Sequence, residues 1–468
     1  MMRSWRLVKS RENIKNDNGL IDWRSFDFNS VEEISFREKD LFPCKLVSIE
    51  RNCFNDFPFL EILSLTSCSI KKIESNVFEN LNKLKKLNLS KNQIEHVDSL
   101  GFQGLTQLKE LHLDRNKLRH MSYEIFQGLS KLKYLNLFWN QIDKIDLNAF
   151  KCLENLEELD LNKNCLTNIE TNMLGYLFKV RKLNLNANQI SSICFGGLKG
   201  LENLRELNFW QNDLHRVDSN IFKSLNKLKK LNLSLNKICK IELNGFRGLD
   251  NLEELNLQYN TLTKLESYSF QNLKKLKILH LEWNQLKQID ANGFLGVENL
   301  EDLTLSQNKL VSIEPYTFKD LKKLKRLDLS VNLINQIDLD AFEGLNNLEE
   351  LNLHKNKLTQ VQANIFKHLT KLKIFNLSIN AIDHIDQNGF KGLENLESLD
   401  LSMNRIKSIE ARTFEYVNKL KKLDLNFNPL EKIDDFKGLE NLEELILESH
   451  FRVDSNILRM MTKLKSEF

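Results

Sequence analysis

Residues 228–251 read LKKLNLSLNKICKIELNGFRGLDN, and this stretch decides the fold because the chain repeats it. Its apolar positions and its ladder asparagine return twenty-four residues later as Leu252, Leu255, Leu257, Asn260, Leu262, Leu265, Phe270 and Leu273. Leu231 and Leu233 flank Asn232, which is the period-two pattern of a short strand with one buried face. A unit of this size cannot bury its apolar edge alone, so we expect thin coils that stack into a continuous core.

An asparagine marks the same position in nearly every repeat. The column runs without insertion or deletion through Asn92, Asn116, Asn140, Asn164, Asn188, Asn212, Asn236, Asn260, Asn284, Asn308, Asn332, Asn356, Asn380, Asn404 and Asn428. Each of these asparagines comes just after a strand and lies inside the stack. A buried amide there must find hydrogen-bond partners. We expect backbone groups of the neighbouring coils to supply them, so that the column forms a structural ladder.

A second column, of phenylalanine, closes the far side of each coil. Its members are Phe54, Phe78, Phe102, Phe126, Phe150, Phe222, Phe246, Phe270, Phe294, Phe318, Phe342, Phe366, Phe390 and Phe414, with Leu174 and Leu198 in two adjacent coils. We interpret this column as core rather than as a cofactor pocket. A column this wide pushes the far side outward, which predicts a concave parallel sheet of about 17–18 short strands, roughly 4.8 Å apart.

The spacing Leu-x-x-Leu-x-Leu-x-x-Asn resembles the leucine-rich repeat family over residues 31–450. The Phe-containing form of the repeat is similar to the typical class in Slit-like proteins, Toll-like receptor ectodomains and chaoptin-like proteins. This resemblance implies an α/β solenoid, a horseshoe with its sheet on the concave side and loops, turns or short 3-10 segments on the convex side. It also implies protein recognition at the cell surface or outside the cell.

The sequence departs from that class at both ends. Residues 1–20 are polar and basic without an apolar centre, so we expect no secretory signal there. Cysteine clusters in the end caps are absent, and no apolar run is long enough for a transmembrane helix, so we expect no membrane insertion. The resemblance favours an extracellular or cell-surface location, whereas these departures allow a cytoplasmic protein or a fragment of a longer receptor.

The pattern also predicts how the chain is divided. We expect a loosely docked tail at residues 1–30, which carry no repeat signal, and a degenerate N-terminal capping repeat at 31–59. The regular repeats then occupy residues 60–450. Ile457, Leu458, Met461 and Leu464 form a helical apolar stripe, which predicts a capping helix at residues 451–468 over the open end of the stack.

Composition argues against several other classes of function. The net charge is +3 with 28% charged residues, so we expect no nucleic-acid partner. Seven cysteines lie at scattered positions without metal-ligand spacing, and we therefore expect no metal site and no cofactor. No histidine pairs with a nucleophile and an orienting acid, and no phosphate-binding glycine loop occurs, which predicts no catalytic residues and no enzyme activity.

Two charge patterns accompany the repeat. Strand entries alternate between lysine and glutamate, as at Lys325 and Glu349, which we interpret as a scaffold feature that opposes slippage by one coil. An acid also recurs six residues after the ladder position, for example at Asp98 and Asp386. Such acids can accept backbone N–H groups that open the convex turn, which we favour, or they can bind divalent cations between coils.

Exposed aromatic residues are the candidate ligand-binding positions. Against a polar background, the strand and rim positions carry Tyr134, Phe138, Trp139, Trp210, Tyr259 and Trp283, with His112, Arg115, His280, Glu282 and Lys355 as polar companions. Aromatic side chains on a concave solenoid surface are typical anchors for a protein ligand. The alternative interpretation is that these rings pack on the neighbouring coil and cover the core.

These observations favour a non-enzymatic module that binds a protein ligand on its concave surface, in recognition, signalling or adhesion. Two alternatives remain open. One is a structural or adhesion protein that associates with itself, and the other is an intracellular scaffold or inhibitor with free thiols. The sequence identifies neither the partner nor the oligomeric state.

Overall fold

The structure is a computed structural model that describes residues 6–10, 31–37, 49, 51 and 53–448. The chain divides into two compact units. Unit 1 consists of Met1–Leu214 and Ile221–Leu231, and unit 2 consists of His215–Asn220 and Asn232–Phe468. In the part of the chain that the structure describes, no helical segment has the length and apolarity that a bilayer crossing requires.

One strand of each coil belongs to the inner sheet. In unit 1 these strands are β1 (Arg6–Ser10), β2 (Val31–Arg37), β3 (Ile62–Thr66), β5 (Lys86–Asn88), β7 (Glu110–His112), β9 (Tyr134–Asn136), β11 (Glu158–Asp160), β13 (Lys182–Asn184) and β15 (Glu206–Asn208). In unit 2 they are β19 (Glu254–Asn256), β21 (Ile278–His280), β23 (Asp302–Thr304), β25 (Arg326–Asp328), β27 (Glu350–Asn352), β29 (Ile374–Asn376), β31 (Ser398–Asp400), β33 (Lys422–Asp424) and β35 (Glu444–Ile446). The remaining inner strand, β17 (Lys230–Asn232), spans the sequence boundary between the units.

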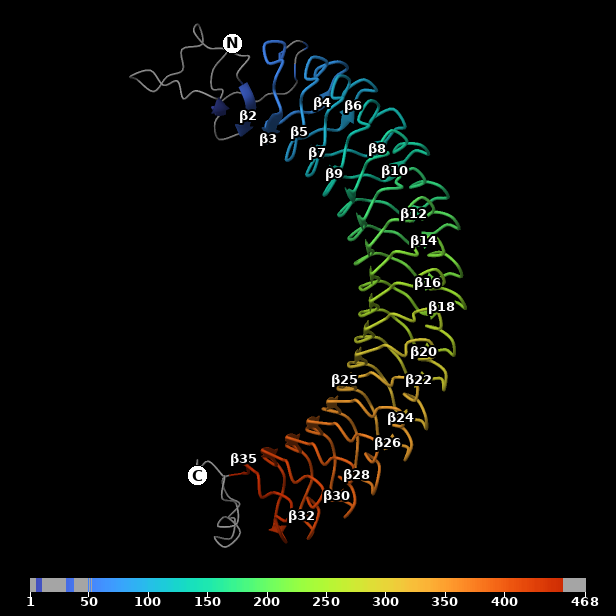
Figure 1. Ribbon diagram of the computed structural model, residues 1–468, viewed down its shortest axis with the longest axis vertical. Helices are drawn as coiled ribbons and strands as arrows, with labels where there is room; N and C mark the ends of the chain where they lie inside the picture. The colour runs from blue at the N-terminus through green and yellow to red at the C-terminus, as the bar shows by residue number, and fades with distance from the viewer. Residues whose placement is uncertain (1–5, 11–30, 38–48, 50, 52, 449–468) are drawn as a thin grey trace, which may run out of the picture. The chain divides into compact units, whose positions relative to one another are not determined.

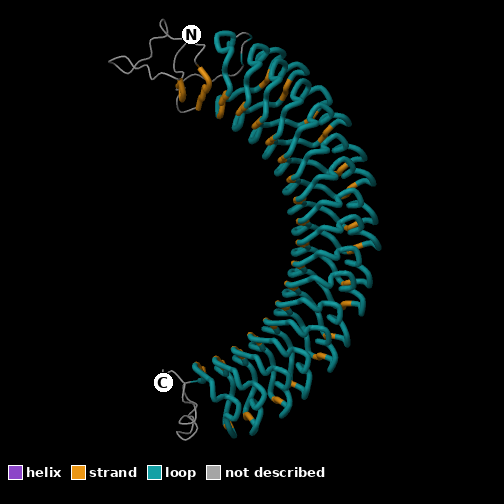
Figure 2. Tube along the Cα trace, viewed as in Figure 1, coloured by secondary structure: helices purple, strands orange, loops and turns teal. Residues whose placement is uncertain are grey.

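The outer side of the coils carries strands of two residues. In unit 1 these are β4 (Lys72–Ile73), β6 (His96–Val97), β8 (His120–Met121), β10 (Lys144–Ile145), β12 (Asn168–Ile169) and β14 (Ser192–Ile193). In unit 2 they are β16 (Arg216–Val217), β18 (Lys240–Ile241), β20 (Lys264–Leu265), β22 (Gln288–Ile289), β24 (Ser312–Ile313), β26 (Gln336–Ile337), β28 (Gln360–Val361), β30 (His384–Ile385), β32 (Ser408–Ile409) and β34 (Lys432–Ile433). Turns and loops make up the rest of each coil (Figure 2).

Apart from β1, the inner strands pair in parallel and in register, which confirms the predicted solenoid of stacked coils. In unit 1, Glu158 lies opposite Lys182, and in unit 2, Arg326 lies opposite Glu350, in each case its counterpart one repeat later. Figure 1 shows the arrangement within single units, where β7 and β9 lie on the inner side of the bend and β8 and β10 on the outer side. Every coil therefore presents one short strand to the inner surface of its unit.

Some features differ from the sequence-based expectations or lie beyond the description. Residues 6–10, within the predicted tail, form β1, which pairs antiparallel with β2. On the convex side, the predicted turns are present, and two-residue strands accompany them. The described residues contain no 3-10 segment. The predicted capping helix at residues 451–468 lies outside the described residues.

The core of each unit consists of the leucine strands and the phenylalanine column. Phe318 is fully buried, and its ring centroid lies 5.8 Å from that of Phe294 and 6.4 Å from that of Phe342. Leu174 and Leu198 occupy the same position in two coils of unit 1 and are fully buried as well. The column therefore fills the interior between the sheet and the outer turns, as expected for core residues.

Asn332 shows how the asparagine column is bonded. Its Nδ2 donates to the carbonyls of Leu305 and Leu329, both at 3.0 Å, and its Oδ1 accepts the N–H of Leu310 at 3.0 Å. The Leu329 carbonyl also accepts from Nδ2 of Asn356 at 3.0 Å, so one oxygen joins two successive coils. Because nearly all amides of the column are buried in this way, each coil is bonded to its neighbours through its interior.

The acidic column accepts backbone N–H groups, and basic side chains neutralise it. Asp98 Oδ2 accepts the N–H of Ser75 at 3.2 Å, and Asp386 Oδ2 accepts the N–H of Ala363 at 2.9 Å, each from the preceding coil. Lys72 lies 3.2 Å from the other carboxylate oxygen of Asp98. Similar ion pairs join Arg216 to Asp218, Lys240 to Glu242 and Lys264 to Asp290, and Nε2 of His120 and of His384 lies 2.8 Å and 3.0 Å from Asp146 and Asp386. These partners offset the repulsion that stacked carboxylates would otherwise produce.

Candidate ligand-binding surfaces

The aromatic group of unit 1 surrounds Trp139, which follows β9. The Trp139 side chain is 50% exposed, and the guanidinium carbon of Arg115 lies 5.1 Å from its ring centroid. The ammonium of Lys163 lies 4.7 Å from the same ring, and Phe138 packs edge-on against it with centroids 6.0 Å apart. Cations in contact with an aromatic face are attracted to it. Arg115 and Lys163 therefore hold the indole in place while half of its surface stays available.

His112 and Tyr134 form the second part of this group, on neighbouring strands β7 and β9. Their ring centroids are 5.2 Å apart. Burial, assisted by the charge of Lys86, lowers the pKa of His112, and burial together with Asp160 raises the pKa of Tyr134. Both groups therefore favour their neutral forms. His112 Nε2 lies 3.7 Å from Glu110, beyond hydrogen-bond range.

The inner surface beside these rings is acidic. Asp114 accepts hydrogen bonds from Ser90 Oγ at 2.5 Å and from Asn136 Nδ2 at 3.2 Å. Burial raises the pKa of Asp160, and the charge of Asp114 adds to this effect. A partly buried carboxylate next to aromatic rings suits a ligand that brings hydrogen-bond donors or positive charge.

Trp210 lies away from the other aromatic residues of unit 1. The backbone N–H of Trp210 donates to Asn208 Oδ1 at 2.9 Å, and its backbone carbonyl accepts the N–H of Ala187 at 2.8 Å. In the described part of unit 1, no aromatic side chain is in ring contact with Trp210. The predicted aromatic set is therefore not one continuous patch.

In unit 2, Tyr259 and Trp283 form a stacked pair. They occupy equivalent positions of successive coils, one residue before the ladder asparagine. Their ring centroids lie 5.2 Å apart with an interplanar angle of 12°. Tyr259 is 43% exposed and Trp283 is 47% exposed. The two rings therefore cover one another on one side and present a flat aromatic surface to solvent on the other.

Glu282 connects this pair to the inner surface. Its carboxylate accepts a hydrogen bond from Thr304 Oγ1, and Oε1 lies 3.5 Å from His280 Nδ1. Burial opposes ionisation of Glu282, but the bonds from His280 and Thr304 outweigh it and lower the pKa. The bond to Glu282 raises the pKa of His280, against the effect of burial. The ion pair therefore places a fixed, partly buried polar contact beside Trp283.

The pKa values of the two histidines should be shifted in opposite directions from the ordinary value of 6.5, downward for His112 and upward for His280. Protonated His280 stabilises the folded state, so its contribution is complete below pH 6.5 and is lost as pH rises through its raised pKa. Neutral His112 stabilises the folded state, so its contribution is lost as pH falls from 6.5 through its lowered pKa. NMR titration of the ring protons measures both values, with H112Q and H280Q to assign the signals. In E282Q the midpoint of His280 should fall, and a midpoint that stays raised would contradict this account.

Several residues of these surfaces were not predicted from the sequence. Lys163 follows Trp139 by one repeat and Thr304 follows His280 by one repeat, so the repeat period alone could have identified both as neighbours. The backbone one residue before the ladder position is left-handed, with φ values of 53°, 53° and 55° at Trp139, Tyr259 and Trp283. The sequence does not reveal this conformation, because glycine or asparagine would be the usual residue there.

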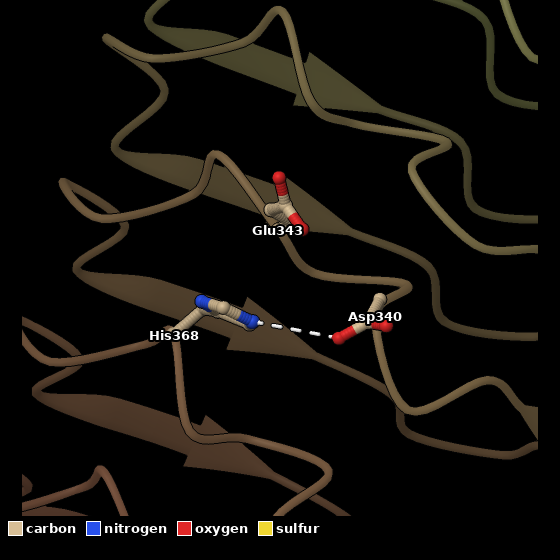
Figure 3. Close-up of side chains that lie close together, drawn as sticks. All are labelled: Asp340, Glu343 and His368. Atoms are coloured by element: carbon tan, nitrogen blue, oxygen red, sulfur yellow. Dashed lines mark ion pairs between the residues drawn. The ribbon is translucent and has the colours of Figure 1, made fainter.

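A cluster on the outer side of unit 2 contains metal-binding residue types. Figure 3 shows Asp340, Glu343 and His368, whose donor atoms lie within 4.8 Å of one another. His368 Nε2 is 3.8 Å from Asp340 Oδ1, and the ammonium of Lys367 lies 2.8 Å from the same oxygen. Lys367 also lowers the pKa of Asp340. An ammonium in this position satisfies the Asp340 carboxylate and repels a cation, so we interpret the cluster as a polar group that surrounds the Lys367–Asp340 ion pair.

Family models agree with this architecture. A model described as "Leucine rich repeat" matches residues 43–94, 58–118, 83–142, 140–190, 202–262, 346–406 and 394–449. A model described as "BspA type Leucine rich repeat region (6 copies)" matches residues 239–373. The chain therefore belongs to the leucine-rich repeat family, which confirms the resemblance. No curated protein matches the sequence significantly.

Solved structures with a similar fold come from several sources. One chain in a structure of the Toll–Spatzle complex from Drosophila is 25% identical to this chain, with a TM-score of 0.73. The match covers 85% of this chain and 57% of that chain. This chain thus spans little more than half of the length of that protein. A leucine-rich-repeat protein of Leptospira interrogans is 25% identical with a TM-score of 0.60, over 88% of this chain and 96% of that one. A TLR13–ssRNA13 complex, at 23% identity and a TM-score of 0.52 over 94% and 80% of the two chains, shares the fold alone.

Proposed function

We propose that this chain is a non-enzymatic binding module that captures a protein ligand on the inner surfaces and rims of its coils. The observation that carries the proposal is the stacked pair of Tyr259 and Trp283, which leaves about half of each ring in solvent. Rings that served only to cover the core would be more deeply buried. Rigid, half-exposed aromatic side chains are the usual anchors of protein interfaces.

The charge around the aromatic group of unit 1 supports a protein ligand over a nucleic acid. Glu110, Asp114, Glu158 and Asp160 lie on the inner strands or directly beside them, and a phosphate backbone would be repelled by them. Of the cations near this group, Arg115 and Lys163 are engaged with Trp139, and Lys86 is paired with Glu110 at 2.7 Å. The solved Toll structure is itself a complex with Spatzle, which supports a role in recognition, signalling or adhesion for this chain.

The proposal predicts that W139A and W283A each weaken capture of the partner. Truncation of a central aromatic anchor costs about 2 kcal/mol or more, which is roughly a thirtyfold loss of affinity. The native chain and both variants are immobilised, the captured proteins are identified by mass spectrometry, and the affinity of the purified partner is measured by calorimetry.

Tyr316 supplies a matched control for this experiment. It is 44% exposed and adopts a φ of 59°, so it resembles Trp283 in exposure and backbone, but it lies in an outer turn. Y316A should capture the partner as the native chain does. Undiminished capture by both tryptophan variants, with native circular dichroism, would refute the proposed function.

A further inference from the structure

A groove of about 630 Å³ runs along one edge of unit 2. Its lining comes mostly from two rows of side chains, one residue before and one residue after each ladder asparagine, in successive coils from Trp283 to Arg405. These positions lie where each coil turns after its inner strand. The groove therefore begins at the aromatic pair and continues across the neighbouring coils.

The backbone of this groove is strained at two apolar residues. Val331 has a φ of 53° and Ile379 has a φ of 51°. β-branched side chains in the left-handed region are disfavoured, at a cost on the order of 1–2 kcal/mol per residue. Ile379 is 36% exposed and Val331 is half-buried, so neither gains full burial in return. The packing within unit 2 therefore does not explain why apolar β-branched residues occupy these positions.

Other apolar side chains extend the same surface. Leu333 is 43% exposed and lines the groove between Val331 and the next coil, and Ala381 lines it beside Ile379. Together with Trp283 they place apolar side chains in alternate coils of the groove, and the coils between them contribute Gln307, Lys309, Lys355 and Lys357. Exposed apolar side chains gathered in one groove mark a contact site for another molecule.

The charge of the groove is entirely basic. Lys309, Lys355, Lys357 and Arg405 line it, and no acidic side chain does. Among the described residues, none of these four side chains forms a salt bridge, and Lys309 alone donates a hydrogen bond, to Gln285 Oε1 at 3.3 Å. Elsewhere in unit 2 lysines are paired with acids, as Lys373 is with Glu349 at 2.7 Å. A partner with negative charge would complement this groove.

We propose that the groove binds an extended, acidic segment of a protein partner, whose apolar side chains contact Val331, Leu333 and Ile379 and whose carboxylates contact the basic rim. The proposal rests on the proposed function and specifies its ligand. Six coils at a spacing of about 4.8 Å give a length of roughly 24 Å, which matches about seven residues of extended chain. The apolar side chains between the basic ones favour a protein segment over a nucleic acid, which would present phosphates to them. The hollow surface favours a protein segment over a flat membrane.

The proposal is tested with a phage library of random peptides of about 12 residues, which is long enough to span the groove. The library is selected on the full native chain, and phages that also bind a K357E/R405E variant are removed. Peptides that survive should be enriched in Asp and Glu interspersed with Leu and Ile. The best peptide should lose about tenfold or more of its affinity for K357E/R405E and for L333S/I379S. K274E/K391E, which reverses two exposed lysines outside the groove, should bind it as the native chain does.

Several outcomes would overturn the proposal. One is that no peptide survives, or that the survivors are no more acidic than the library. Single-stranded oligonucleotides and anionic phospholipid vesicles are tested in parallel, and binding that K357E/R405E abolishes and L333S/I379S preserves would assign the groove to a polyanion instead. Dimerisation of the native chain in light scattering, lost in both groove variants, would assign it to a second copy. If W139A and W283A abolish partner capture while no peptide survives, the proposed function stands and this proposal alone fails.

Discussion

Replacing Asn332 with alanine should destabilise unit 2 by about 3 kcal/mol. The substitution leaves the buried N–H of Leu310 without its acceptor, which costs about 1–3 kcal/mol, and it removes two further hydrogen bonds of about 1 kcal/mol each. The carbonyls of Leu305 and Leu329 keep a second amide donor, from Asn308 and Asn356, which limits the loss. The cost should therefore be dominated by one orphaned backbone group.

Denaturant unfolding and hydrogen exchange provide the measurement for Asn332. Because a long repeat array need not unfold in one step, exchange rates of the amides in the coils beside Asn332 are the more direct quantity. Asn335 is exposed and its side chain lies outside the ladder, so N335A should change stability by less than about 0.5 kcal/mol. Equal effects of N332A and N335A would show that the buried amide does not hold the coils together.

Replacing Phe318 with alanine should be at least as damaging, with a loss of about 3–5 kcal/mol. The ring is completely buried between Phe294 and Phe342, so its removal leaves a cavity that the rigid coils on both sides cannot close. F318L should cost less than about 1.5 kcal/mol, because leucine retains most of the apolar volume. The chain already places Leu174 and Leu198 at this position in unit 1.

Thermal and denaturant unfolding of F318A and F318L separate the two contributions. The expected result is a large shift of the midpoint for F318A and a small one for F318L. If leucine is as disruptive as alanine, then the shape of the stacked rings, and not the filling of the interior, governs stability at this column. Amide exchange in the coils of Phe294 and Phe342 should rise in F318A, since those rings lose a stacking partner.

The repeat period predicted those parts of the fold that every coil shares. The positions of the leucines, the asparagines and the phenylalanines depend on a spacing that is visible in the sequence, and the structure places them in the interior. The outer strands did not follow from the sequence, because two residues such as Lys240 and Ile241 are too few to show alternation. β1 did not follow either, since Arg6–Ser10 carries no repeat signal and pairs antiparallel with β2.

The candidate surfaces were only partly predictable for a related reason. The sequence identified which positions point away from the core, and it therefore identified the aromatic residues. It did not identify their contacts, such as the cations around Trp139 or the stack of Tyr259 on Trp283, because these depend on side-chain geometry across coils. The sequence did not predict the groove, because Val331 and Leu333 are adjacent to an interior residue and carry no repeat signal of their own.

The alternating ion pairs along the inner sheet bear on how such a chain can change its length. Lys325 lies 2.7 Å from Glu301, and Lys373 lies 2.7 Å from Glu349. Excision of residues 325–348 would bring Glu349 against Glu301, whereas excision of residues 325–372 would bring Lys373 there and restore an attractive contact. In unit 2, duplication or loss of coils two at a time therefore preserves these attractive contacts, whereas odd steps bring like charges together. Addition or removal of coils in pairs would therefore change the length of the array without changing the Lys–Glu contacts between neighbouring coils.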